Sequence, residues 1–261
     1  MEETLRAAGN EAAVRTPATR PAGAMAQCVD ALRIVTDPRL PVRLRVRTSA
    51  ALVNHLDDAA ASMPDELRLR QVADAYDAAL HEQLLPTLAG LGSELVDWAE
   101  LNRFERLRVI DTFEHQIHPV LTPLAVDAAH PFPRVPDRSV SLALRVREPS
   151  AHRTRFVCIT LPAHRPRFVA VHAGRVVPTE SVVLALLPRL VAGVELEESG
   201  CFRVTRSGGA VVRLEVEQRT TAEMTDLLGA RFAVPDSRIF RVRSPLAMGA
   251  PMAELPAEGL P

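Results

Sequence analysis

The sequence predicts an α+β fold, in which an antiparallel helical bundle precedes a domain with a mostly antiparallel sheet. Two patterns carry this prediction. Up to about residue 118, apolar residues recur every three or four positions, as in amphipathic helices. After residue 138 they alternate with polar residues, as in strands with one buried face. Between the patterns lies the segment 121–133, LTPLAVDAAHPFP, whose prolines no regular helix can accommodate.

These patterns divide the chain into four segments. Residues 1–22 are small, polar and interrupted by proline, so we expect a disordered lead-in. Residues 23–118 form the helical domain, and residues 119–245 form the α+β domain. Residues 246–261 are rich in proline, alanine and glycine, so we expect a disordered tail.

The helical domain is predicted from apolar stripes and from the breakers between them. Pro41 suits the first turn of a helix, whereas Asp37-Pro38 and Met63-Pro64 interrupt the pattern. Gly90 and Gly92 indicate a turn before the last helix. The expected helices cover residues 24–36, 41–60, 65–88 and 100–118. The last of them carries the stripe Leu101, Phe104, Leu107, Ile110, Phe113 and Ile117.

The second domain is predicted from alternation of period two. Val140, Leu142 and Leu144 alternate with small or polar residues, which indicates a half-buried strand. Ser207-Gly208-Gly209 joins two further strands as a short hairpin turn. An apolar helix is expected after Thr179, where it would pack on the sheet, and a second helix is expected over residues 220–228. The expected strands cover residues 139–146, 155–161, 166–172, 175–177, 194–206, 210–218 and 239–242.

Composition narrows the class of protein. The net charge is −1, so the chain lacks the basic field that attracts nucleic acid. All 31 basic residues are arginine, so any side-chain contact to phosphate must use a guanidinium fork. Three scattered cysteines, Cys28, Cys158 and Cys201, favour neither a disulfide framework nor a metal site. With no apolar run of about 20 residues, we expect no membrane span and a cytoplasmic protein.

Candidate sites are few. Neither a nucleophile elbow nor a glycine-rich phosphate loop occurs, so we assign no catalytic residue. His115 and His118 lie three apart, but a zinc site needs further ligands, so we assign no metal site. Arginines crowd the region after residue 133, where they could face a polyanion or cover the wet face of a sheet. The four that we single out are Arg134, Arg138, Arg145 and Arg147.

One stretch carries a family resemblance. HPVLTPLAVDAAHPFP, followed by SVSLALRVREP, resembles the start of the middle (head) domain of bacterial polyphosphate kinase. Enzymes of that family use ATP to extend chains of inorganic phosphate. The resemblance continues through LPAHRPRFVAV, CFRVTR and VRLEVE, and covers roughly residues 25–245. It implies that the α+β domain is the head domain, and that ATP and Mg²⁺ belong to the family reaction; we assign no cofactor to this chain.

The resemblance also suggests binding residues. Asn54-His55-Leu56-Asp57-Asp58 falls where the family carries a Ser-Asn-Leu-Asp-Glu-Phe motif, whose asparagine helps to hold the ATP base. Counting back from Leu56-Asp57 puts His55 at the asparagine position and Asn54 one residue early. Both are therefore the candidates for nucleotide binding. The four arginines singled out above become the candidates for polyphosphate binding.

The sequence departs from the family in three places. It lacks the tryptophan-containing signature near residues 21–26, and a long helix is replaced by residues 207–209. The two C-terminal catalytic domains, which carry the phosphorylated histidine, do not follow residue 245. We therefore expect a truncated polyphosphate-kinase-like protein that is inactive alone. The alternative is a non-catalytic subunit, or a regulator that binds polyphosphate or nucleotide. The candidate partners are polyphosphate, a second copy and a full-length polyphosphate kinase.

Overall fold

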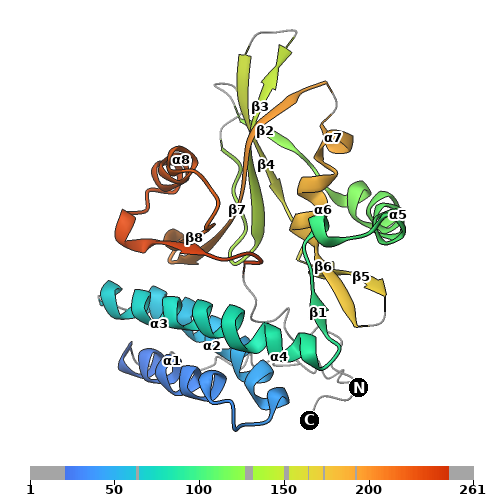
Figure 1. Cartoon of the computed structure of the whole chain (residues 1–261). Coiled ribbons are helices and arrows are strands. Elements are labelled where there is room, and N and C mark those ends of the chain that lie inside the picture. Colours follow the sequence, from blue (N-terminus) through green and yellow to red (C-terminus); the bar gives the residue numbers. More distant parts are fainter. Residues whose placement is uncertain are drawn as a thin grey trace, which may run out of the picture.

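The computed structural model describes residues 21–246 except 63–64, 127–131, 150–152, 164, 173 and 192. The predicted lead-in falls outside the described residues up to residue 20, and the predicted tail falls outside them from residue 247. A helical bundle lies below a sheet that carries helices on both faces (Figure 1). The predicted α+β class is confirmed.

The bundle contains the first three helices that the sequence predicts, whereas the predicted fourth helix, residues 100–118, packs on the sheet. Asp65 caps the third one, because its side chain accepts a hydrogen bond from the backbone nitrogen of Arg68 at 3.0 Å. The predicted helix over residues 65–88 is interrupted by a π-helical turn at Leu80–Leu84, after which Pro86 stands in the first turn of the next helix. The bounds are α1 Pro21–Thr36, α2 Val42–Ser62, α3 Glu66–Ala79 and α4 Leu85–Gly90.

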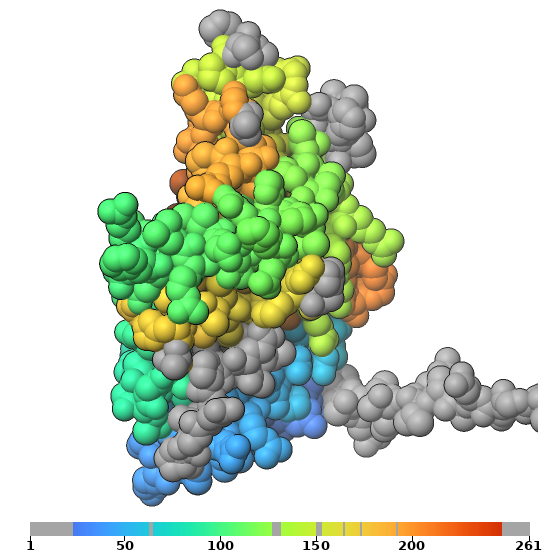
Figure 2. All heavy atoms as spheres, turned by 90° about the vertical axis from the view of Figure 1, so that its right-hand side faces the viewer, coloured from blue at the N-terminus to red at the C-terminus, as the bar shows by residue number. Residues whose placement is uncertain are grey.

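The next helix, α5 (Arg103–Thr112), begins at a capping box formed by Asn102 and Glu105. It continues through a π-helical turn, in which Phe113 is fully buried among residues of the sheet. Figure 2 shows α5, in green, above the yellow segment and apart from the blue helices. The predicted stripe was wrong at two positions, because Phe104 is 79% exposed and Leu107 is 56% exposed. The boundary between residues 118 and 119 stays a prediction.

Two sheets follow. The larger has the strand order β2-β4-β3-β7-β8-β9, and the smaller has the order β1-β6-β5. All neighbouring strands are antiparallel except β8 with β9 and β1 with β6. The sheets are therefore mixed, with mostly antiparallel pairs as predicted. The bounds are β1 Glu94–Leu95, β2 Leu124–Val126, β3 Val140–Glu148, β4 Arg153–Thr160, β5 Phe168–His172, β6 Arg175–Pro178, β7 Glu195–Ser207, β8 Ala210–Glu217 and β9 Ile239–Val242.

Each face of the larger sheet has its own core. Helix α6 (Thr179–Ala185) and the short α7 (Leu187–Leu190) lie on the same side as α5, and α8 (Ala222–Phe232) lies on the other (Figure 1). The lower edge of the head rests on α2 and α3, where Phe240 of β9 enters the core of the bundle. In the part of the chain that the structure describes, no helix has the length and apolar character to cross a bilayer.

Candidate functional site

A buried cluster of charges joins α2 of the bundle to strands β7 and β8. Asp57 is 0% exposed, and its Oδ1 atom accepts hydrogen bonds from Arg203 Nη1 at 2.9 Å and from Thr205 Oγ1 at 2.8 Å. Arg213 Nη1 also donates to this oxygen, at 3.2 Å. Glu215 completes the cluster, since it lies 2.8 Å from Arg203 and 2.7 Å from Arg213. Alternation along the two strands puts all four partners on the face that meets the bundle.

The cluster balances two guanidinium groups against two carboxylates. Burial raises the pKa of Asp57, but the hydrogen bond and charge of Arg203, the charge of Arg213 and the hydrogen bond from Thr205 outweigh it, so the pKa is lowered overall. Burial lowers the pKa of Arg203, and the charges of Glu215 and Asp57 raise it overall. Asp57 and Arg203 therefore stay charged at neutral pH. Because loss of any one partner would leave a buried charge without compensation, the cluster fixes the head against the bundle.

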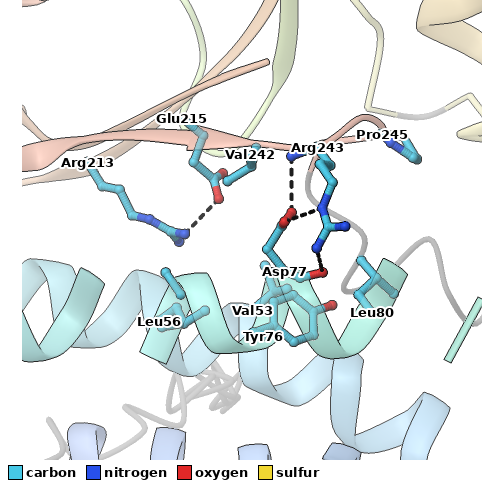
Figure 3. Close-up of a pocket in the computed structure, with 11 residues that line it drawn as sticks. Val53, Leu56, Tyr76, Asp77, Leu80, Arg213, Glu215, Val242, Arg243 and Pro245 are labelled. Carbon is cyan, nitrogen blue, oxygen red and sulfur yellow. Dashed lines mark hydrogen bonds and ion pairs between the residues drawn. The ribbon is translucent and has the colours of Figure 1, made fainter. Parts of the chain in front are cut away.

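Figure 3 shows the neighbouring part of this junction. Arg243, just after β9, wraps around Asp77 of α3: its backbone nitrogen lies 3.0 Å from Oδ1, and its Nε atom lies 2.7 Å from Oδ2. A cavity of about 30 Å³ remains between Tyr76, Arg213 and these residues. That volume suits about one water molecule. This cavity is therefore too small for a nucleotide, and the contacts around it serve to hold the head on the bundle.

The predicted nucleotide-binding residues lie on α2 beside the cluster. Asn54 is exposed and His55 is half-buried, whereas Asp57, in the same turn, points into the head. Asn54 and Asp58 lie one turn apart, so they share the outer face of the helix. The assignment of Asn54 and His55 to nucleotide binding stays a prediction.

Three of the four predicted arginines face carboxylates. Arg145 lies 3.2 Å from Glu198 and 3.3 Å from Glu223. Arg147 pairs with two acidic residues of β7, Glu195 and Glu197. Arg138 lies 2.9 Å from Asp58 of α2 and 3.7 Å from Asp137 of its own turn. These contacts fit the reading in which arginines cover the wet face of a sheet.

The fourth, Arg134, lies in a different setting. It lines a groove of about 360 Å³ together with Arg206 of β7 and Arg231 of α8. No acidic residue occurs among the described residues that line the groove. Arg206 is held in place, because it donates to the carbonyl oxygens of Val135 at 3.4 Å and of Gly209 at 3.1 Å. Arg206 and Arg231 were not among the predicted residues, because only the fold brings these separate segments together.

An aromatic pair forms one wall of this arginine groove. Phe132 meets Phe232 edge to face, with ring centroids 5.1 Å apart. The wall holds the segment before Arg134 against the end of α8, so it sets the spacing between Arg134 and Arg231. The groove therefore combines three cationic forks with a fixed apolar side.

The two histidines near residue 118 serve local structure. His118 stacks on Phe113 with ring centroids 5.6 Å apart, and His115 Nδ1 lies 2.9 Å from the carbonyl oxygen of Asp111. Across the described residues, no three His, Cys, Asp or Glu side chains converge closely enough to hold a metal ion.

Comparison with known proteins defines the class. The family model of the polyphosphate kinase middle domain matches residues 105–208. The polyphosphate kinase of Streptomyces coelicolor is 35% identical over 204 residues, which cover 69% of this chain and 27% of that protein. The polyphosphate kinase of Mycolicibacterium gilvum is 30% identical over 256 residues, which cover 76% of this chain and 35% of that protein.

A solved structure shares the fold. The crystal structure of polyphosphate kinase from Porphyromonas gingivalis superposes with a TM-score of 0.78 at 18% identity, covering 91% of this chain and 41% of that one. The helical bundle and its head thus have the architecture of a polyphosphate kinase. The chain belongs to the polyphosphate kinase family, and it spans about a quarter to a third of the length of these curated relatives.

Proposed function

We propose that this chain is a phosphate-chain-binding module of a polyphosphate kinase system, with no phosphoryl-transfer activity of its own. The observation that carries the proposal is the arginine groove. Planar guanidinium groups pair with phosphate oxygens through two parallel hydrogen bonds, so three of them along one groove suit a chain of phosphates.

The groove is the best placed of the arginine clusters. Among the described residues, neither Arg134 nor Arg231 has a carboxylate partner, so a phosphate can bind without breaking an ion pair. Arg145 and Arg147 would first have to leave their glutamates. Of the four arginines predicted to bind polyphosphate, the proposed groove therefore keeps only Arg134. It adds Arg206 and Arg231.

The second half of the proposal concerns chemistry. Transfer of a phosphoryl group needs a nucleophile such as histidine and cationic groups clamped around the moving phosphate. The groove supplies the cations, but its described lining includes no histidine or carboxylate. We assign the transfer step to a full-length polyphosphate kinase as the partner in the cytosol, and a second copy of this chain is the other candidate partner for assembly. ATP and Mg²⁺ would belong to that partner's reaction, with Asn54 and His55 as the proposed contacts of this chain to the base.

Binding of polyphosphate by purified protein tests the proposal. Calorimetry at two ionic strengths should show binding that weakens steeply with salt. Arg134→Ala and Arg231→Ala should each weaken it about tenfold, the value of one charge-assisted contact. Arg147→Ala, which removes an ion-paired arginine, is the matched control and should leave it nearly unchanged. Absence of binding at low salt would exclude the groove as a polyphosphate site. ATP-dependent extension of polyphosphate by the protein alone would exclude the proposal that a separate kinase carries out the transfer.

A further inference from the structure

The turn before β3 holds a residue in an unusual backbone conformation. Arg138 has a φ of +58°, in the left-handed region that residues with a Cβ atom rarely adopt. Its backbone is fixed from both sides by β7: its nitrogen donates to the carbonyl oxygen of Val204 at 2.8 Å, and its carbonyl oxygen accepts from Arg203 Nε at 3.3 Å. Backbone strain of this kind persists only where the surrounding structure enforces it, and strained residues of this kind cluster at functional sites.

Three carboxylates compete for the guanidinium of Arg138. Its Nη2 atom lies 2.9 Å from Asp58, and its Nε atom lies 3.5 Å from Asp57 and 3.7 Å from Asp137. Asp57 is already satisfied inside the buried cluster by Arg203, which pairs with both of its oxygens. The contact that depends on Arg138 is thus the one to Asp58. The side chain of Arg138 is 40% exposed and that of Asp58 is 57% exposed. Ion pairs between exposed side chains are weak and are screened by salt.

This turn adjoins the arginine groove. Arg138 lies four positions after Arg134, so their Cα atoms are at most about 14 Å apart. The carboxylate of Asp137 accepts a hydrogen bond at 2.7 Å from the backbone nitrogen of Arg206, whose side chain lines the groove. A phosphate chain that extends past this end of the groove would come within reach of Arg138, whose guanidinium lies against α2.

We propose that the pair Arg138–Asp58 is an autoinhibitory contact, which rests on the proposed binding of polyanions in the groove. A polyanion in the groove competes with Asp58 for the guanidinium. Arg138 then leaves Asp58 and becomes a fourth phosphate contact, while Asp57 stays paired inside the cluster. The released carboxylate of Asp58 lies one turn from Asn54, so polyanion binding adds a bare negative charge to that face of α2.

A double-mutant cycle on polyphosphate binding tests this contact. Asp58→Asn should tighten binding about threefold, the value typical of an exposed ion pair, because Arg138 no longer has to leave a partner. In the Arg138→Ala background the same change should have almost no effect. Asp74→Asn is the matched control, since Asp74 is an exposed aspartate of α3 with no ion-pair partner among the described residues, and the change removes the same charge.

The outcomes separate this inference from the proposed function. If polyphosphate binds and Arg134→Ala weakens it, but Asp58→Asn acts equally with and without Arg138, the groove stands and the autoinhibitory contact is refuted. If Asp58→Asn only matches Asp74→Asn, the contact is refuted as well. If the wild-type protein binds no polyphosphate at low salt, the groove itself fails and this inference fails with it. Because Asp58 is exposed, its variant should keep the melting temperature of the wild type.

Discussion

Replacement of Asp57 by asparagine is the sharpest perturbation of the junction between bundle and head. It removes one negative charge from a cluster in which two arginines and two carboxylates balance. Arg203 and Arg213 are then left with Glu215 alone, so one positive charge stays buried without compensation. Breaking a buried ion pair from one side costs about 3–5 kcal/mol. Asparagine retains one oxygen as an acceptor, so we expect about 3 kcal/mol.

Urea denaturation measures this loss. The only tryptophan, Trp98, reports on the head by fluorescence, and circular dichroism reports on the helices. Asp58→Asn, which removes an exposed carboxylate one residue away, should cost less than about 1 kcal/mol. The pair Asp57→Asn with Arg203→Leu restores the charge balance, so its cost should fall below the sum of the two single changes. A loss under about 1 kcal/mol for Asp57→Asn would refute the reasoning.

Two further predictions concern the stability of the protein in acid and the turn at Gly174. Because the folded state lowers the pKa of Asp57, its contribution is complete above the ordinary value of 3.8 and is lost as pH falls through the folded-state value. The stability difference between wild type and Asp57→Asn should therefore be constant near neutral pH and shrink below about pH 4, and a difference that grows there would contradict this. Gly174→Ala should cost about 2 kcal/mol or more by denaturation, because a Cβ atom would lie 1.9 Å from the carbonyl oxygen of Gly92 at a φ of +79°. Gly193→Ala is the matched control, with a similar φ of +76° but open space, and should cost about 1 kcal/mol.

Local patterns in the sequence predicted the elements, because helix and strand periods are properties of short segments. The turn Ser207–Gly209 is an example: both glycines adopt the positive φ values that the predicted hairpin requires. Packing partners were less predictable. The apolar residues of α5 recur at helical spacing, yet the structure leaves Phe104 and Leu107 in solvent, since the pattern does not say how wide the buried face is.

The contacts of the candidate site depend on separations that no local pattern records. Asp57 and Arg203 are 146 positions apart, and their pairing follows only from the docking of α2 on the sheet. Two arginines of the groove, Arg206 and Arg231, likewise come from a strand and a helix that the fold brings beside residue 134. From sequence, Arg134 could not be distinguished from its ion-paired neighbours, because charge partners lie on other strands.

Mapping of arginines by phenylglyoxal and mass spectrometry tests the central claim most directly, namely that this family member holds phosphate chains in the arginine groove. Modification of the purified protein should be compared with and without polyphosphate at low salt. The account predicts selective protection of Arg134, Arg206 and Arg231, with Arg145 and Arg147 unchanged. Equal protection of all five arginines, or protection of the ion-paired residues alone, would contradict it.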